Sequence, residues 1–217
     1  RLTLARLFSG AAFLYKSEAP AKNHTQGPVS NWELATRLSY FLTSSAPDAE
    51  LTLAASREAL AKSESLAAHA RRLLQDRHAR RLAIEFACQW LHIRNFDQHD
   101  EKNEKLYPEF AGLRGKMYEE SILFFTDFFQ NDRSILSLLN ADHTFVDPDL
   151  AKHYALPALG EGWQRIEDVQ KFGRGGILGF ATTLAKQSGA SRTSPILRGN
   201  RVSETLQIGT PSCRDRV

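Results

Sequence analysis

Apolar side chains recur at helical spacing along most of this sequence, and this periodicity limits the folds that the chain can adopt. The clearest case follows Ser30, where Leu34 and Leu42 lie on one face of a helix predicted at residues 31–44. Ser30 and Glu33 have the spacing of a capping box, in which each side chain accepts a hydrogen bond from the backbone amide of the other. Helix packing is therefore the expected source of the core.

The same spacing predicts helices along the rest of the chain. They span residues 1–15, 47–55, 64–76, 79–94, 114–130, 134–139, 147–154, 177–186 and 194–208. Asp132 is expected to cap the helix at residues 134–139, and Asp147, followed by a proline, to cap the helix at residues 147–154. Proline and glycine are frequent after Leu156, and there we expect a short strand at residues 164–169. The expected fold class is all-α, an irregular multi-helix bundle of about eight helices with a long Gly-rich loop region near residues 155–176.

The predicted helix at residues 79–94 carries one apolar stripe. Its members are Leu82, Ala83, Phe86, Ala87, Trp90 and Leu91. Cys88 lies in the same helix and is expected to be a small, buried, apolar residue. Together with Cys213, which we expect to be exposed, it makes neither a disulfide framework nor a zinc site, and a bridge between the two remains open.

Composition excludes several classes of protein. Of the 217 residues, 42% are hydrophobic and 24% are charged, which is ordinary globular usage and excludes a disordered, collagen-like or coiled-coil chain. The net charge of +3 is too small to indicate nucleic-acid binding. No apolar run approaches the ~18 residues of a membrane span.

The sequence contains none of the familiar catalytic signatures: no zinc-protease helix motif, no phosphate-binding loop and no nucleophile elbow. His92 and His99 flank an acidic loop that holds Asp97 and Asp100. A polar surface loop is favoured there over a metal site, because zinc needs three or four ligands on a rigid frame. We therefore predict no metal ligands and no cofactor within this chain.

The least ordinary region is residues 172–199, and it supplies the candidate site. The candidate ligand-binding or anion-binding residues are Arg174, Gly175, Gly176, Arg192, Thr193, Ser194 and Arg198. Ser194 caps a predicted helix whose amides, with Arg192 beside them, would hold a carboxylate, sulfate or phosphate. A structural role is the favoured alternative, in which the arginines neutralise buried carboxylates or helix carbonyls and the glycines permit close packing.

Several segments match, in order, the motifs of one protein family. They are Phe13–Glu18, Glu33–Asp48, Phe86–Leu91, Ala141–Tyr154, Arg174–Gly179 and Arg192–Gly199. Residues 33–42, ELATRLSYFL, resemble the family's ELASRLSYFL, and residues 192–199, RTSPILRG, resemble its RTSPVLRG. Through these motifs the chain resembles the large secreted cytochrome-like proteins of planctomycetes and related bacteria. Thr43 departs from the pattern, since it stands where the family has Trp.

This resemblance implies that the chain is a piece of a longer, exported multidomain protein, periplasmic or secreted. It implies a lead-in helix and linker over residues 1–30, then two domains of unknown function over residues 31–140 and 141–217, packed as one unit. The implied partners are the other domains of the parent, a cytochrome c module among them. Any c-type haem would lie in that module and not in this chain, and neither nucleic acid nor a membrane span is implied.

Two functional hypotheses follow. In the favoured one, the chain is a helical module with an interaction or substrate-binding role beside a c-type haem domain. In the alternative, it is part of an oxidoreductase or a polymer-processing enzyme, with an anion-binding site built from the arginine and glycine motifs. Neither hypothesis assigns a catalytic residue.

Overall fold

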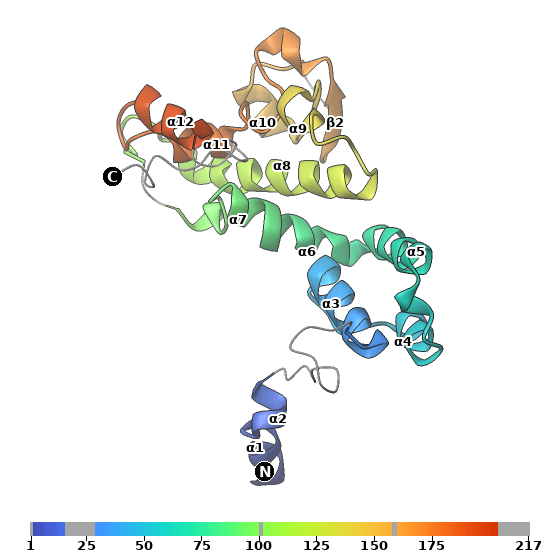
Figure 1. The fold of residues 1–217 in the computed structure, drawn as a ribbon. Coiled ribbons are helices and arrows are strands. Elements are labelled where there is room, and N and C mark those ends of the chain that lie inside the picture. The colour runs from blue at the N-terminus through green and yellow to red at the C-terminus, as the bar shows by residue number, and fades with distance from the viewer. Residues whose placement is uncertain (1, 16–28, 100–101, 158–159, 204–217) are drawn as a thin grey trace, which may run out of the picture. The chain divides into compact units, whose positions relative to one another are not determined.

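The computed structural model describes residues 2–15, 29–99, 102–157 and 160–203. They fall into two compact units, Arg1–Leu73 and Leu74–Val217. Helices dominate both units, which confirms the all-α prediction (Figure 1). The boundary at residues 140/141 between the two domains that the resemblance implies stays a prediction.

The first unit is a set of short helices. They are α1 (Leu2–Phe8), α2 (Ala11–Leu14), α3 (Asn31–Thr43), α4 (Ala49–Ser56), the 3-10 turn η1 (Ala59–Ala61) and most of α5 (Ser63–Leu74). The predicted capping box is confirmed: the Glu33 amide donates to Ser30 Oγ at 3.2 Å, and the Ser30 amide donates to Glu33 Oε2 at 2.7 Å. α3 packs on α4, around a small core that includes Leu51 and Leu60.

The second unit is built on the long helix α8 (Phe110–Gln130). A continuous helical run lies alongside it, made of the turn η2 (Arg77–Ala79), α6 (Arg80–Leu82), the π-helical turn η3 (Ala83–Ala87) and α7 (Cys88–Trp90) (Figure 1). The remaining helical elements are η4 (Phe96–Gln98), α9 (Ser137–Asn140), α10 (Pro148–His153), η5 (Val169–Phe172), α11 (Ala181–Lys186) and α12 (Pro195–Arg201). No helix of the described segments is both long and apolar enough to cross a membrane.

The π-helical turn corrects the predicted stripe. The buried side chains of this run are Ala79, Leu82, Ala83, Ala87, Cys88 and Leu91. Phe86 is 49% exposed, so its prediction as a core residue is wrong. A π turn holds one more residue than an α turn, and every position after it is rotated by one residue on the helix surface. The prediction that Cys88 is buried is confirmed, at 0% exposure.

A two-stranded antiparallel sheet packs on α8. It pairs β1 (His143–Val146) with β2 (Gln164–Glu167), with His143 opposite Glu167 and Val146 opposite Gln164. The strand at β2 was predicted. β1 was not, because four residues between a turn and the Asp147 helix cap are too few to show strand periodicity.

Several helix bounds differ from the predictions. The predicted helix at residues 1–15 is divided into α1 and α2, and α4 begins at Ala49 rather than residue 47. α8 begins at Phe110 rather than residue 114, and α11 begins at Ala181 rather than residue 177. Asp132 does not cap α9: its φ is 45°, a left-handed conformation that ends the preceding helix instead. Asp147 and Ser194 cap α10 and α12 as predicted, while the predicted end of the last helix, like Cys213, lies outside the described residues.

Phenylalanine side chains of α8 fill the core of the second unit. The ring of Phe124 lies 5.8 Å from Phe125 and 4.9 Å from Phe180, and it stacks on His143 at 5.3 Å. Phe124 is 1% exposed. This core fixes α8 against the sheet and against the start of α11. It therefore also fixes the position of the residues at the amino end of α8.

Candidate ligand-binding site

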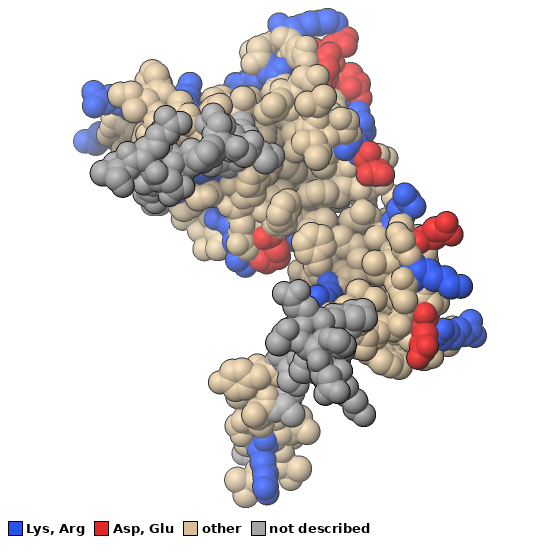
Figure 2. Space-filling view, viewed as in Figure 1, with Lys and Arg blue, Asp and Glu red and all other residues tan. Residues whose placement is uncertain are grey.

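A pocket of about 500 Å³ lies in the second unit. Its apolar lining comes from α8, from α11 and from the segment just before α8, and consists of Leu106, Tyr107, Pro108, Phe110, Leu113, Met117, Ala181, Leu184 and Ala185. Its lysine and arginine lining comes from three separate stretches of sequence and consists of Lys102, Arg174, Arg192 and Arg198. On the face seen in Figure 2, Lys and Arg side chains stand at the α12 end without an acidic neighbour, whereas both signs alternate at the sheet end. The pocket therefore joins an apolar floor to a cationic rim.

Lys102 organises one wall of the pocket. Its Nζ donates to the carbonyls of Ala185, Ser188 and Gly189 at 2.7, 2.9 and 3.1 Å. These carbonyls lie at the carboxyl end of α11, where a cation is favoured by the unpaired backbone oxygens. The next residue, Asn103, is held to the same segment, because its backbone amide donates to Ala190 O at 3.0 Å. The Lys102 ammonium group therefore holds the end of α11 in place as one wall of the pocket.

Arg174 faces both the pocket and the protein interior. Its Cζ lies 4.0 Å from the centre of the Tyr154 ring, a cation–π contact, and its Nη1 donates to Gly179 O at 3.1 Å. A guanidinium carries several further N–H donors. Burial and the nearby Arg174 charge lower the pKa of His153, which also lines the pocket. The structure therefore fixes the Arg174 side chain while leaving donors for a ligand.

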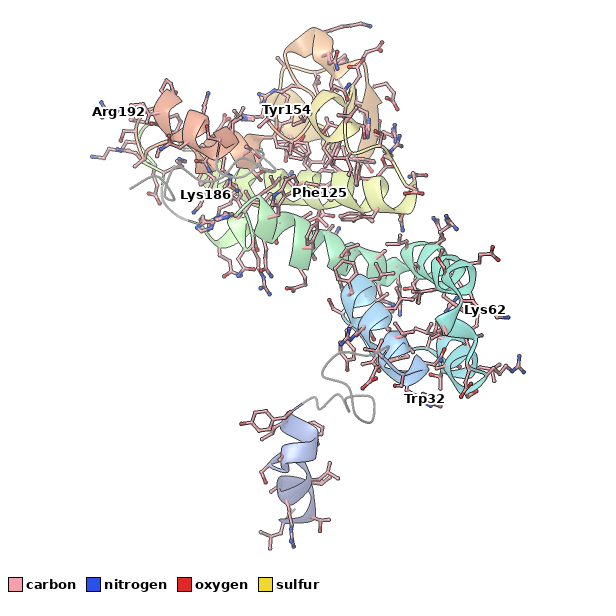
Figure 3. The ribbon with its side chains drawn as sticks, in the orientation of Figure 1. Trp32, Lys62, Phe125, Tyr154, Lys186 and Arg192 are labelled. Atoms are coloured by element: carbon pink, nitrogen blue, oxygen red, sulfur yellow. The ribbon has the colours of Figure 1, made fainter. Side chains whose placement is uncertain are left out.

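Arg192, Thr193 and Arg198 also line the pocket. An isolated antiparallel bridge between Ser188 and Thr193 folds this segment into a tight turn beside the end of α11, and Arg192 projects near α12 (Figure 3). Arg198 lies on α12, and its Nε is buried without a hydrogen-bond partner among the described residues. A buried donor of this kind is rare, because an unmade hydrogen bond costs free energy.

The other three predicted site residues lie apart from the pocket lining. Gly175 and Gly176 have φ of 134° and 58°, and a Cβ on Gly176 would stand 2.4 Å from Leu139 O. These glycines let the loop approach α9, where the Ile177 amide donates to Leu138 O at 2.8 Å. Ser194 Oγ accepts from the amide of Leu197 at 3.4 Å as the cap of α12. The glycines therefore serve packing, and Ser194 serves the helix.

Behind the pocket lies a buried carboxyl group that the sequence analysis missed. Glu120 is 1% exposed, and its two oxygens accept from Thr144 Oγ1 at 2.6 Å and Tyr154 Oη at 2.5 Å. Burial raises the pKa of Glu120 to about 7, although the two hydrogen bonds and the charge of Arg174 oppose the shift. The signal was present: Glu120 follows Met117 by three residues and precedes Phe124 by four, so it lies on the apolar face of its helix.

Other polar clusters of the second unit are structural. Asp127 accepts from Arg133 Nε at 2.8 Å and from Arg165 Nη1 at 3.2 Å, and His143 Nε2 lies 3.5 Å from it. Burial raises the pKa of the Cys88 thiol to about 12, which leaves it unreactive at neutral pH. Among the described residues no three His, Cys, Asp or Glu side chains gather as a metal site would require.

Comparison with known protein families gives a match over the central part of the chain. The model of the PSD4 family, described as proteins of unknown function (DUF1592), matches residues 29–156, more than half of the 217-residue chain. No curated protein and no solved structure matches the chain. The matched segment includes Lys102, Glu120 and all of α8, while Arg174, Arg192 and Arg198 follow it. This chain belongs to the PSD4 family of proteins of unknown function.

Proposed function

We propose that this chain is a binding module whose pocket holds a small organic anion with an apolar body. The observation that carries the proposal is the convergence of Arg174, Arg192 and Arg198 on a pocket floored by apolar side chains of α8 and α11. A charged group and an apolar surface in one pocket select ligands that have both features. The proposal combines the binding role of the favoured sequence hypothesis with the arginine site that the alternative hypothesis named.

The arginines are suited to a carboxylate, sulfate or phosphate group. Arginine presents a planar fork of donors to such groups, and charge-assisted hydrogen bonds are stronger than neutral ones. Arg198 supports the proposal further, because its buried Nε has no partner in the described part of the chain and a bound anion would supply one. Lys102 is the less suitable group, since the α11 carbonyls already hold its ammonium.

We propose further that the module works within an exported multidomain protein, periplasmic or secreted, next to a c-type cytochrome domain. The support for this setting is the family resemblance of the sequence motifs. In that setting the other domains of the parent are the partners of this chain, and haem is bound by one of them.

An enzymatic role is the second candidate. His153 and Glu109, two groups capable of acid–base chemistry, line the same pocket. Glu109 acts to raise the pKa of His153, while burial and Arg174 lower it. No hydrogen bond joins the two side chains among the contacts of the described residues. The convergent arginines therefore favour binding over an oxidoreductase or polymer-processing activity.

Titration calorimetry with three probes tests the binding role. Octanoate offers both a carboxylate and an apolar chain, inorganic phosphate offers charge alone, and octanol offers the chain alone. We expect octanoate to bind more tightly than either of the other two, because only it uses the arginines and the floor together. Equal affinity for octanoate and octanol would contradict a role for the arginines.

Substitution of Arg192 should weaken octanoate binding without unfolding the chain. Arg192→Ala removes a charged hydrogen-bond donor, and such a bond is worth about 1.5–3 kcal/mol, or roughly a tenfold to hundredfold loss of affinity. Arg192 is exposed, so the melting temperature should change little. Arg77→Ala is the matched control: it removes the same charge from an exposed position outside the pocket lining and should leave the affinity unchanged. A similar loss in both variants would show that only net charge matters.

A further inference from the structure

We infer that the pocket binds its anion together with a proton, which Glu120 takes up, and that Arg174 couples the two sites. The inference rests on the proposed function and adds the regulation of that site by pH. Arg174 lines the pocket and also acts electrostatically on the buried Glu120 carboxyl. One cation therefore serves two acidic groups, a ligand on one side and a side chain on the other.

The physical link between the two sites is short. Tyr154 donates to Glu120 through its hydroxyl and carries the Arg174 guanidinium over its ring. The Tyr154 hydroxyl accepts from the amide of Ala181 at 3.2 Å, and Ala181 itself lines the pocket. Tyr154 lies beside α10, above α8 (Figure 3). Two contacts thus join the pocket wall to the carboxyl group, one through Arg174 and one through Ala181.

The charges act in one direction. With the pocket empty, the positive charge of Arg174 favours the ionised form of Glu120, against the cost of burying a carboxylate. A bound anion offsets that positive charge, so the ionised form loses the Coulombic support of Arg174, although it keeps the larger support of the Thr144 and Tyr154 hydrogen bonds. The pKa of Glu120, about 7 without a ligand, therefore rises when an anion binds. Near neutral pH, binding then draws a proton onto the carboxyl group.

The groups that act on Glu120 come from three directions. Tyr154 follows α10, Arg174 follows η5, and Thr144 of β1 contributes its hydroxyl. α11 contributes no charge near Ala181, since Lys186 lies in its last turn. Other titratable groups on elements packed against α8 face residues other than Glu120. On the elements before and within α8, His78 faces Asp76, Arg80 faces Glu119, Glu85 faces Arg94, and Cys88 and Asp97 act on Tyr118. Near β1 and α10, Lys116 faces Asp147 and Asp149, His143 faces Asp127, Lys152 acts on Asp149, and Arg174 and Glu109 act on His153.

Coupling between two sites is reciprocal, so a ligand that raises the pKa of Glu120 must bind more tightly once Glu120 is protonated. At a pH below the pKa that Glu120 has in the ligand-free protein, Glu120 is already protonated, and the anion binds at full affinity without taking up a proton. At a pH above the pKa that Glu120 has in the ligand-bound protein, Glu120 stays ionised, and the anion binds with lower affinity. With a full coupling of about fivefold, the lower end of the usual range, we expect octanoate to bind about threefold more tightly at about pH 6 than at about pH 8.

Calorimetry of octanoate in buffers of different protonation enthalpy measures this uptake directly. At about pH 7, where Glu120 is partly ionised, the observed heat should depend on the buffer and report a fraction of a proton taken up per ligand. Octanoate itself stays ionised at this pH. Glu120→Gln should abolish the uptake and make the affinity independent of pH between about pH 7 and about pH 8, where His153 is neutral.

His153 is the competing source of a proton, because it titrates at the same pocket. His153→Gln should retain the uptake; loss of the uptake in His153→Gln and its retention in Glu120→Gln would overturn the inference. If Glu120→Gln does not fold, infrared spectra of the intact chain give the answer, since a new band of a protonated carboxyl group should appear with octanoate. Binding with no uptake and no such band refutes the coupling alone, whereas no binding heat at all refutes the proposed function.

Discussion

Gly176→Ala is expected to lower the free energy of unfolding by about 3 kcal/mol or more, since a left-handed backbone and a steric clash both oppose the added methyl group. The φ of Gly176 is +58°, and the new Cβ would stand 2.4 Å from Leu139 O and 2.7 Å from Leu138 O. These are backbone atoms of α9, so no side-chain rotation relieves the contact. The loop must move away from α9 and lose the hydrogen bond from Ile177 to Leu138.

Urea denaturation measures this effect, and Gly115→Ala is the matched control. Gly115 lies inside α8, and a Cβ there would meet no atom within 4 Å. The same chemical change should therefore stabilise the chain by about 0.5–1 kcal/mol, because alanine restricts the unfolded chain more than glycine does. The two substitutions should therefore change the free energy of unfolding in opposite directions. A neutral Gly176→Ala would contradict the close approach of the loop to α9.

Phe124→Ala is expected to cost about 3–5 kcal/mol, the usual range for a fully buried phenylalanine. Its ring contacts Phe125, Phe180 and His143, so the substitution leaves a cavity between α8, the sheet and the start of α11. Neighbours held by two other elements cannot collapse into that space, and the loss should lie at the upper end.

Phe86→Ala is the control for Phe124→Ala. Phe86 is 49% exposed, and its ring centre lies 6.5 Å from that of Phe129. We expect a loss of about 1 kcal/mol or less, because a half-exposed ring gives up little buried area. A larger loss at Phe86 than at Phe124 would mean that the predicted stripe, and not the observed one, forms the core.

Helices and caps were predictable because they depend on neighbours in sequence. The capping box at Ser30 and the aspartate cap at Asp147 combine a side chain with an amide three residues later, and both are found. The start of α11 was not predictable, because the loop before it is held against α9, more than thirty residues earlier, by the close approach of Gly176 and by the hydrogen bond from Ile177 to Leu138 O. Long-range packing of this kind leaves no periodic pattern in the sequence.

The candidate site was predictable only in part, for the same reason. Its arginines were unusual enough in sequence to be singled out, and Arg174, Arg192, Thr193 and Arg198 line one pocket. Their companions from α8 and the segment at Lys102 are distant in sequence and carry no motif. Glu120 differs from these: its place on the apolar face of α8 was visible in the sequence, but its hydrogen-bond partners Thr144 and Tyr154 were not.

The π-helical turn at Ala83–Ala87 has a consequence for the tolerance of this helix to changes in length. Losing one residue from an α-helix normally turns every later side chain away from its contacts, and the helix no longer fits its site. Here the turn already contains one residue more than an α-helix needs, with the exposed Phe86 inside it. A chain shorter by that one residue would form an unbroken α-helix that still directs Leu82, Cys88 and Leu91 to the core. This is a point in the fold where a deletion can be absorbed within a helix instead of a loop.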